Sequence, residues 1–126
     1  MREWTWTRIE DMLLGRSRHA CGKVGNAIVV AGGYRTKRTS EVLSLDSMTW
    51  TEGPQIPVSG DFYGAAVYQR ENTFYLIGGS SGVSFLDEVY EIDLANSVWV
   101  ERPEKLNGKR DGHSAVAVPD GFLRCS

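Results

Sequence analysis

The feature that most constrains this chain is an internal repeat with a period of about 47 residues. Four features recur in the same order: a glycine pair, an acidic residue with valine, an apolar residue with aspartate, and a tryptophan. They are Gly32-Gly33 and Gly78-Gly79, Glu41-Val42 and Glu88-Val89, Leu45-Asp46 and Ile92-Asp93, and Trp50 and Trp99. Repeats of this length are supersecondary units that bury their apolar faces by stacking on neighbours. The sequence therefore predicts an array of similar units.

Each unit contains four segments with the composition of β-strands. The first is rich in small residues, the second is continuously apolar, the third alternates with a period of two, and the fourth carries the tryptophan and ends in charge. The first segments are 20–24, 64–68 and 114–118; the second are 27–31 and 73–77; the third are 41–46 and 87–93; the fourth are 49–52 and 98–101. Short turns between them predict antiparallel order. The fourth strand then lies at an outer edge.

The beginnings of the units can also be aligned. His19 aligns with Tyr63 and then with His113, so that a third unit begins near residue 108. Residues 5–7, with the sequence TWT, are similar to the fourth strand of an earlier unit. The pattern Arg-x-x-His at the first and third unit becomes Gly60 and Tyr63 in the middle unit, so no common chemistry depends on that position.

Four antiparallel strands per unit, with the glycine pair after the second strand and the tryptophan in the fourth, resemble the kelch repeat family of β-propellers. The resemblance covers nearly the whole chain. It implies an all-β fold, a partial kelch-type propeller with two complete four-stranded antiparallel blades and parts of the flanking blades. The expected boundaries are 1–14 for an outer strand of a preceding blade, 15–59 and 60–107 for the two blades, and 108–126 for the inner strands of a further blade.

The glycine pairs have a structural explanation in this arrangement. A sharp turn after the second strand needs positive φ, which glycine reaches without steric cost, and the missing Cβ lets neighbouring backbones approach. A phosphate-binding glycine loop would lead into a helix N-terminus. Here residues 34–42 lead into another strand. We therefore expect Gly32, Gly33, Gly78 and Gly79, together with Trp50 and Trp99, to be structural residues of the blades.

The longer loops are expected on one rim of the blades, because antiparallel order brings them to the same edge. These loops are 34–40, 53–61, 80–86 and 102–112. Binding residues on rigid scaffolds usually lie on such loops. Cationic and aromatic side chains there favour an acidic peptide or protein surface as partner; a solvated loop is the alternative. The candidate partner-binding residues are Tyr34, Arg35, Lys37, Arg38, Phe85, Lys109 and Arg110.

No catalytic or metal-binding pattern is visible in the sequence. Asp87 and Glu88 are neighbours on a strand and point to opposite faces, so they cannot easily share a proton. His19 and His113 have no second ligand at metal spacing. We expect no enzyme activity, no metal and no cofactor. The formal net charge of −2 gives no drive toward nucleic acid, and no apolar run is long enough to cross a membrane.

The cysteines and the ends of the chain leave several alternatives open. Cys21 is interpreted as a small buried residue, with a disulfide to Cys125 or a reactive thiol as alternatives. The chain has fewer units than the four blades of the smallest propellers, so it cannot close a ring alone. Either it is an arbitrary fragment, or its C-terminus is natural and 108–126 complete a blade begun by an absent N-terminal region; we favour the second. Open edges predict self-association.

The resemblance also implies a function. Kelch proteins are most often protein-interaction modules, commonly the substrate-recognition part of cullin-type ubiquitin ligase adaptors with an upstream BTB domain. A cytoplasmic protein is expected because none of the asparagines, Asn26, Asn72, Asn96 and Asn107, has the Ser or Thr of a glycosylation acceptor two residues on. Extracellular or actin-associated scaffolds are the alternative, and an upstream signal peptide would make the protein extracellular. A galactose-oxidase-like propeller enzyme is the less favoured alternative. Because one fold hosts many functions, the fold alone does not choose among them.

Overall fold

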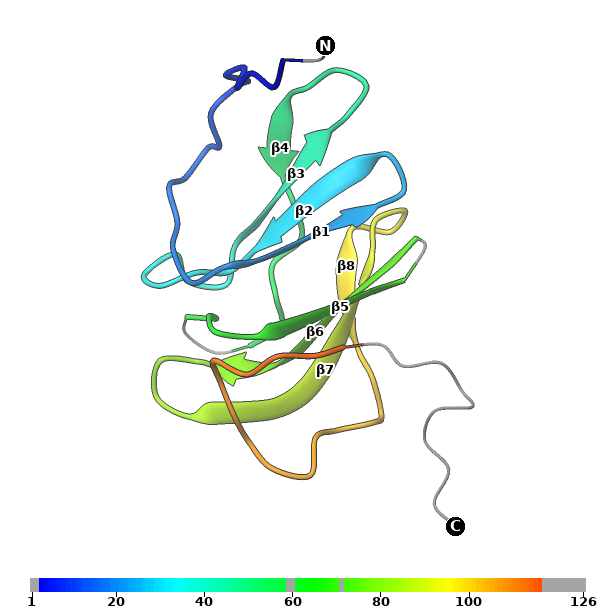
Figure 1. Cartoon of the computed structure of the whole chain (residues 1–126). Helices are drawn as coiled ribbons and strands as arrows, with labels where there is room; N and C mark the ends of the chain where they lie inside the picture. The colour runs from blue at the N-terminus through cyan, green and yellow to red at the C-terminus, as the bar shows by residue number, and fades with distance from the viewer. Residues whose placement is uncertain (1–2, 59–60, 71, 117–126) are drawn as a thin grey trace.

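The computed structural model describes residues 3–58, 61–70 and 72–116 of the chain. They form two four-stranded antiparallel sheets that stack as two layers (Figure 1), with strand orders β1-β2-β3-β4 and β5-β6-β7-β8. No helix occurs within these described residues. The all-β fold with two propeller-like blades is thereby confirmed. We call β1–β4 blade 1 and β5–β8 blade 2.

Blade 1 consists of β1 (Ala20–Val24), β2 (Ala27–Ala31), β3 (Ser40–Ser44) and β4 (Trp50–Glu52). Small and β-branched side chains suit these strands, because they pack well on a pleated surface. β1 is joined to β2 through a two-residue turn, where Gly25 adopts a φ of 56°. The strand at the outer edge is β4, the short tryptophan strand, as predicted.

Blade 2 consists of β5 (Ala66–Arg70), β6 (Thr73–Ser80), β7 (Phe85–Asp93) and β8 (Val98–Glu101). Its two middle strands are longer than the predicted segments 73–77 and 87–93. The ladder between them continues past the glycine pair through a register shift between Ile77 and Gly79. In blade 2 the glycine pair therefore lies at a β-bulge inside the strand and not after its end.

The structure corrects the predicted alignment of the third strands by two residues. Leu43 lies opposite Trp50 in blade 1, and Ile92 lies opposite Trp99 in blade 2. Leu43 therefore corresponds to Ile92, whereas the sequence alignment paired Leu45 with Ile92. By the same register, Glu41 corresponds to Tyr90 and not to Glu88. A shift of two keeps every side chain on its face, so the period-two pattern could not reveal it.

The beginnings of the units are corrected in the same way. The amide of Tyr34 donates to Ser17 O at 2.8 Å, and the amide of Ser80 donates to Tyr63 O at 2.8 Å. Tyr63 therefore takes the place of Ser17, and not that of His19. Consequently Arg16 corresponds to Phe62, and His19 corresponds to Ala65. The predicted pairing of Arg16 with Gly60 and of His19 with Tyr63 was wrong.

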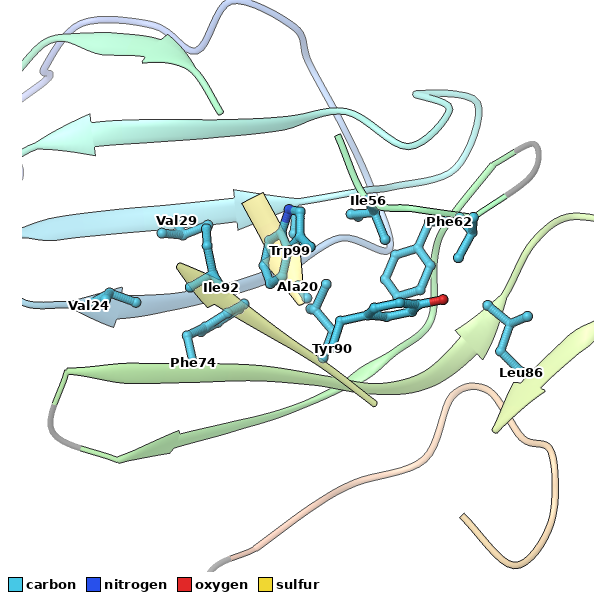
Figure 2. Packing of buried hydrophobic residues seen from close by; sticks show 13 residues of the cluster. Ala20, Val24, Val29, Ile56, Phe62, Phe74, Leu86, Tyr90, Ile92 and Trp99 are labelled. Atoms are coloured by element: carbon cyan, nitrogen blue, oxygen red, sulfur yellow. The ribbon is translucent and has the colours of Figure 1, made fainter. Parts of the chain in front are cut away.

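The hydrophobic core lies mainly between the two blades (Figure 2). Ala20, Val24 and Val29 of blade 1 share one cluster with Phe74 and Trp99 of blade 2. The connection between the blades adds Ile56 and Phe62, both fully buried. Each blade thus buries one face on the other, as expected for repeats that cannot hide their apolar surface alone.

The glycine pairs have the predicted conformation. Gly32 and Gly78 have φ values of 67° and 66°, and Gly33 and Gly79 have values of 131° and 109°. The backbone that enters the following unit approaches each pair. Gly33 donates its N–H to Phe62 O at 2.7 Å, and Gly79 donates to Arg110 O at 2.8 Å. A Cβ on Gly32 would collide with that same carbonyl oxygen of Phe62. The pairs therefore connect consecutive units.

The two tryptophans occupy corresponding positions. Trp50 Nε1 donates to Glu10 O, and Trp99 Nε1 donates to Pro54 O, both at 3.0 Å. Pro54 follows Trp50 by four residues, and Glu10 follows Trp6 by four residues. Trp99 is buried against blade 1, whereas Trp50 is only half-buried. The difference in burial follows from the neighbour: among the described residues, blade 1 has only the segment 3–14 on that side.

The segments that flank the two blades form no strand within the described residues. Residues 5–7 belong to no strand, and Trp6 is fully exposed, since no strand of the described residues pairs with this segment. Residues 114–116 also belong to no strand. The rest of the predicted strand 114–118, and the ending 121–126 with Arg124 and Cys125, lie outside the described residues. The assignment of both flanks to other blades stays a prediction.

The prediction that Cys21 is buried was wrong: the residue is exposed, and its thiol forms no disulfide within the described residues. Along β1, Ala20 and Val24 face blade 2 and are buried, while Cys21 and Lys23 alternate with them onto the other face. The small size of the residue fits a crowded strand, but the period of two places it on the uncovered side. The disulfide to Cys125 is not tested, since Cys125 lies outside the described residues.

Candidate functional site

The loops between β2 and β3 and between β6 and β7 lie along one edge of the two blades, at the left in Figure 1. Residues 102–112 run beneath blade 2 and reach this edge near their end, where the amide of Gly112 donates to Gly64 O. Backbone and side-chain contacts connect them in sequence. Arg38 Nη1 donates to Val58 O at 2.9 Å. Val58 and Leu86 line one cavity, and the amide of Arg110 donates to Leu86 O at 3.1 Å. We call this edge, made by residues 33–39, 53–58, 61–64, 80–86 and 102–113, the long-loop rim.

Internal hydrogen bonds hold the basic loop between β2 and β3 in a defined shape. Thr36 is buried, and its Oγ1 donates to Gly33 O at 2.9 Å. Thr39 Oγ1 donates to Thr36 O at the same distance. Arg35 and Lys37 have positive φ values of 62° and 56°, which non-glycine residues adopt only where the surroundings impose it. The loop therefore presents its cations from a rigid frame.

The cations of this loop differ in how firmly they are held. Arg35 lies over the ring of Tyr34 at 5.2 Å, a cation–π contact at an exposed position. Lys37 is fixed through its backbone, since its amide donates to Asp61 Oδ1 at 2.7 Å and leaves the ammonium exposed. Arg38 Nη1 donates one hydrogen bond to Val58 O. Arg35 and Lys37 are consequently available to a partner, whereas Arg38 also has a structural role.

An aromatic–cationic cluster that the sequence did not predict adjoins this loop. The rings of Tyr34 and Tyr63 meet edge to face with centroids 5.7 Å apart. The guanidinium of Arg18 lies over the ring of Tyr63, 4.6 Å from its centroid. Arg18 Nη2 also lies 3.2 Å from Asp111 Oδ2. Arg18 and Tyr63 were missed because they belong to different units, and only the stacking of units brings them together.

The remaining predicted rim residues lie on blade 2. Phe85 begins β7, opposite Ser80, and its side chain is 56% exposed. Lys109 and Arg110 are exposed, and Arg110 Nε donates to Gly108 O at 3.2 Å within its own turn. Since Arg110 N also donates to Leu86 O, this turn lies beside the start of β7. The predicted residues thus form two groups on the same rim, 34–38 and 85 with 109–110.

A buried ion pair anchors blade 1 just behind the rim. Arg16 Nη2 lies 2.6 Å from Glu41 Oε2, with the two side chains 1% and 3% exposed. Glu41 also accepts the amides of Leu13 and Leu14, and Arg16 Nη1 donates to Gly32 O and Thr39 O. Arg16 Nε has no partner within the described residues. Glu41 is therefore a structural residue.

Blade 2 fills the corresponding positions with aromatic rings. Phe62 and Tyr90 meet edge to face with centroids 6.4 Å apart (Figure 2). Burial raises the pKa of Tyr90 to about 12, and the nearby carboxylates of Glu101 and Glu88 contribute to the rise. The phenol is thus neutral at physiological pH. It lies beside a carboxylate, Glu88, that has no ion-pair partner among the described residues.

Comparison with known proteins agrees with this architecture. The family described as "Kelch motif" matches residues 15–57, which is blade 1 with its connection to blade 2. The chain is 27% identical over 131 residues to acyl-CoA-binding domain-containing protein 4 from Arabidopsis thaliana, an alignment covering 94% of the chain. It is 24% identical over 137 residues to kelch domain-containing protein 10 from Xenopus tropicalis, with 97% of the chain covered.

These relatives are much longer than the chain. The alignments cover 20% of the Arabidopsis protein and 33% of the Xenopus protein. The likeness therefore concerns the repeat units, and the activity of either whole protein does not follow from it. The described residues contain no helix that is long and apolar enough to cross a membrane.

Proposed function

Because this chain belongs to the kelch-repeat family, we propose that it is a protein-interaction module whose long-loop rim binds an acidic segment of a partner protein. Kelch repeats generally mediate protein–protein interaction, and the chain carries two such units. The proposal is one of binding and not of catalysis, and it involves no cofactor.

The observation that carries the proposal is the rigid presentation of exposed cations beside exposed aromatic rings. Arg35 and Lys37 project from a loop whose backbone is held at Gly33, Thr36 and Asp61. Tyr34, 46% exposed, lies between them and Tyr63. Preorganised guanidinium and ammonium groups bind carboxylates at a lower entropic cost, and an adjacent aromatic ring adds apolar contact area. An acidic peptide with an apolar residue fits this surface.

We further propose that the whole protein is a substrate-recognition part of a cullin-type ubiquitin ligase adaptor in the cytoplasm. This finer proposal rests on the setting in which kelch repeats most often occur, and not on a residue of this chain. A BTB domain encoded upstream in the full-length transcript is the expected result. A signal peptide with extracellular modules would favour an extracellular scaffold instead.

Binding of an acidic segment can be tested with charge reversal at the two free cations. We expect the variant Arg35→Glu/Lys37→Glu to bind a labelled peptide of four glutamates around one leucine at least about fivefold more weakly than wild type. Fluorescence anisotropy measures this, with the glutamine counterpart of the peptide as reference. Unfolding free energy should change by no more than about 0.5 kcal/mol, since both side chains are exposed.

Lys23→Glu is the matched control, because Lys23 is an exposed cation near the opposite edge of blade 1. It should bind the acidic peptide as wild type does. Equal loss in the control would show a general charge effect, and unchanged binding in the rim variant would refute the proposed surface. Arg38 is left intact because its contact with Val58 O is structural.

A further inference from the structure

Blade 2 has a cavity of about 300 Å³ on the long-loop rim, between the connection from blade 1 and the start of β7. Its walls include buried apolar side chains, Val58, Leu86 and Tyr90, together with the hydroxyl-bearing Ser81 and Ser84. Glu88 is the single charged residue among its lining residues, and it is half-buried. The cavity thus combines apolar walls with one carboxylate.

Comparison of the two blades shows why this carboxylate has no cationic partner among the described residues. In blade 1, the positions that correspond to Glu88 and Tyr90 are Thr39 and Glu41, and Arg16 donates to both of them. Phe62 replaces that arginine in blade 2, so the guanidinium is lost. Blade 2 nevertheless carries a carboxylate two residues away, at Glu88. No ion pair to Glu88 exists among the described residues.

Neither of two cations near the cavity forms an ion pair with Glu88 among the described residues. Arg38 donates to Val58 O at the edge of the cavity. Lys105 is 4.0 Å from Asp87, which lies on the opposite face of β7 from Glu88. Glu88 Oε2 accepts the backbone amide of Asp87 at 3.1 Å, but the half-buried carboxylate has no cationic partner among the described residues. An incoming cation would relieve part of its desolvation cost. The influence of Glu88 on the pKa of Tyr90 agrees with a negative potential at the cavity floor.

We propose that this cavity is a second subsite of the rim, in which Glu88 receives the guanidinium of an arginine side chain from the partner protein. The inference rests on the proposed function and adds a requirement for the partner: a basic residue beside its acidic segment. Arginine fits better than lysine because its weakly hydrated planar head tolerates apolar walls and can donate two hydrogen bonds to a carboxylate. Its aliphatic stem would lie along Leu86 and Val58.

The test uses the full chain and two small probes of equal shape, N-acetyl-arginine methylamide and its uncharged citrulline counterpart. Titrations followed by amide NMR should show saturable shifts at Ser81, Leu86 and Glu88 with the arginine probe at about millimolar concentration. The citrulline probe should bind at least about tenfold more weakly, because it keeps the stem and loses the charge. Equal binding of the two probes would overturn the proposal.

Substitution of Glu88 is the second test of the subsite. Glu88→Gln should weaken the arginine probe at least about tenfold, whereas Asp87→Asn, a neighbouring carboxylate on the other face, should leave it within about twofold of wild type. Unchanged affinity in Glu88→Gln would refute the subsite. If a substitution disturbs folding, the comparison of the arginine and citrulline probes on the wild-type protein still tests whether the cavity binds a guanidinium.

The two proposals can fail separately. Arg35→Glu/Lys37→Glu should lose the acidic peptide and keep the arginine probe, and Glu88→Gln should do the opposite. If the acidic peptide binds at Arg35 and Lys37 while the arginine probe does not bind, only the second subsite is refuted. If the arginine probe binds at Glu88 while the acidic peptide does not bind, the proposed acidic partner is wrong and the cavity remains a site for a basic side chain.

Discussion

At the scale of single residues, the two blades fill one pair of positions with opposite chemistry. Blade 1 uses the ion pair of Arg16 and Glu41, and blade 2 uses the rings of Phe62 and Tyr90. Burying two charges is costly, and that cost is offset by their mutual attraction together with the hydrogen bonds from Leu13 and Leu14 and to Gly32 and Thr39. An aromatic pair packs there without any such requirement.

Removing one charge of the buried pair should therefore be more harmful than replacing both. We expect Glu41→Gln to lower the free energy of unfolding by about 3 kcal/mol, because it leaves the Arg16 guanidinium buried and unpaired. The double variant Arg16→Phe/Glu41→Tyr, which copies blade 2, should recover at least about half of that loss. Urea denaturation with a common slope measures both changes.

Arg8→Ala is the matched control, since the ion pair of Arg8 with Asp11 is exposed and contributes little. It should remain within about 0.5 kcal/mol of wild type. A Glu41→Gln protein as stable as the control would show that the buried pair does not anchor blade 1.

At the scale of elements, the glycine pairs decide how one unit is attached to the next. Gly32 requires positive φ and also lies against Phe62 O, so a methyl group there meets both strain and a clash. We expect Gly32→Ala to lower the free energy of unfolding by at least about 2 kcal/mol. Gly15→Ala should be nearly neutral, because nothing lies within 4 Å of the added carbon. Thermal melts of the two variants make the comparison.

Most elements of the fold could be predicted from the sequence, because they depend on local patterns. Strand order and the edge position of the tryptophan strands follow from local patterns, and both are confirmed. The glycine pairs have positive φ as expected, but in blade 2 the pair lies at a bulge inside the strand and not at a turn after it. The alignment of Glu41 with Glu88 failed because alternation is unchanged by a shift of two residues. The exposed Cys21 was misjudged because its face depends on which neighbour is present.

The candidate site was only partly predictable for a related reason. Loop composition identified the cations of residues 34–38, although the connection between the blades, through Val58 and Asp61, also holds this loop in place. The cluster of Tyr63 with Arg18, and the cavity at Glu88, depend on contacts between units. Such contacts join residues far apart in the sequence, which no local pattern brings together.

At the scale of the whole molecule, the central claim is that each blade is stable only against its neighbour. The shared cluster places Val29 of β2 and Ile92 of β7 in one core. A weakened contact in either blade should therefore destabilise both. Blades that folded independently would respond separately, as local units of differing stability do.

Native-state hydrogen exchange of the variant Ile92→Val tests this claim directly. The substitution should cost about 1 kcal/mol in blade 2. If the blades form one cooperative unit, the slowest amides of β2 in blade 1 and of β6 in blade 2 will lose protection by the same factor, about fivefold. Unchanged protection in β2, with the loss confined to β6 and its neighbours, would contradict it.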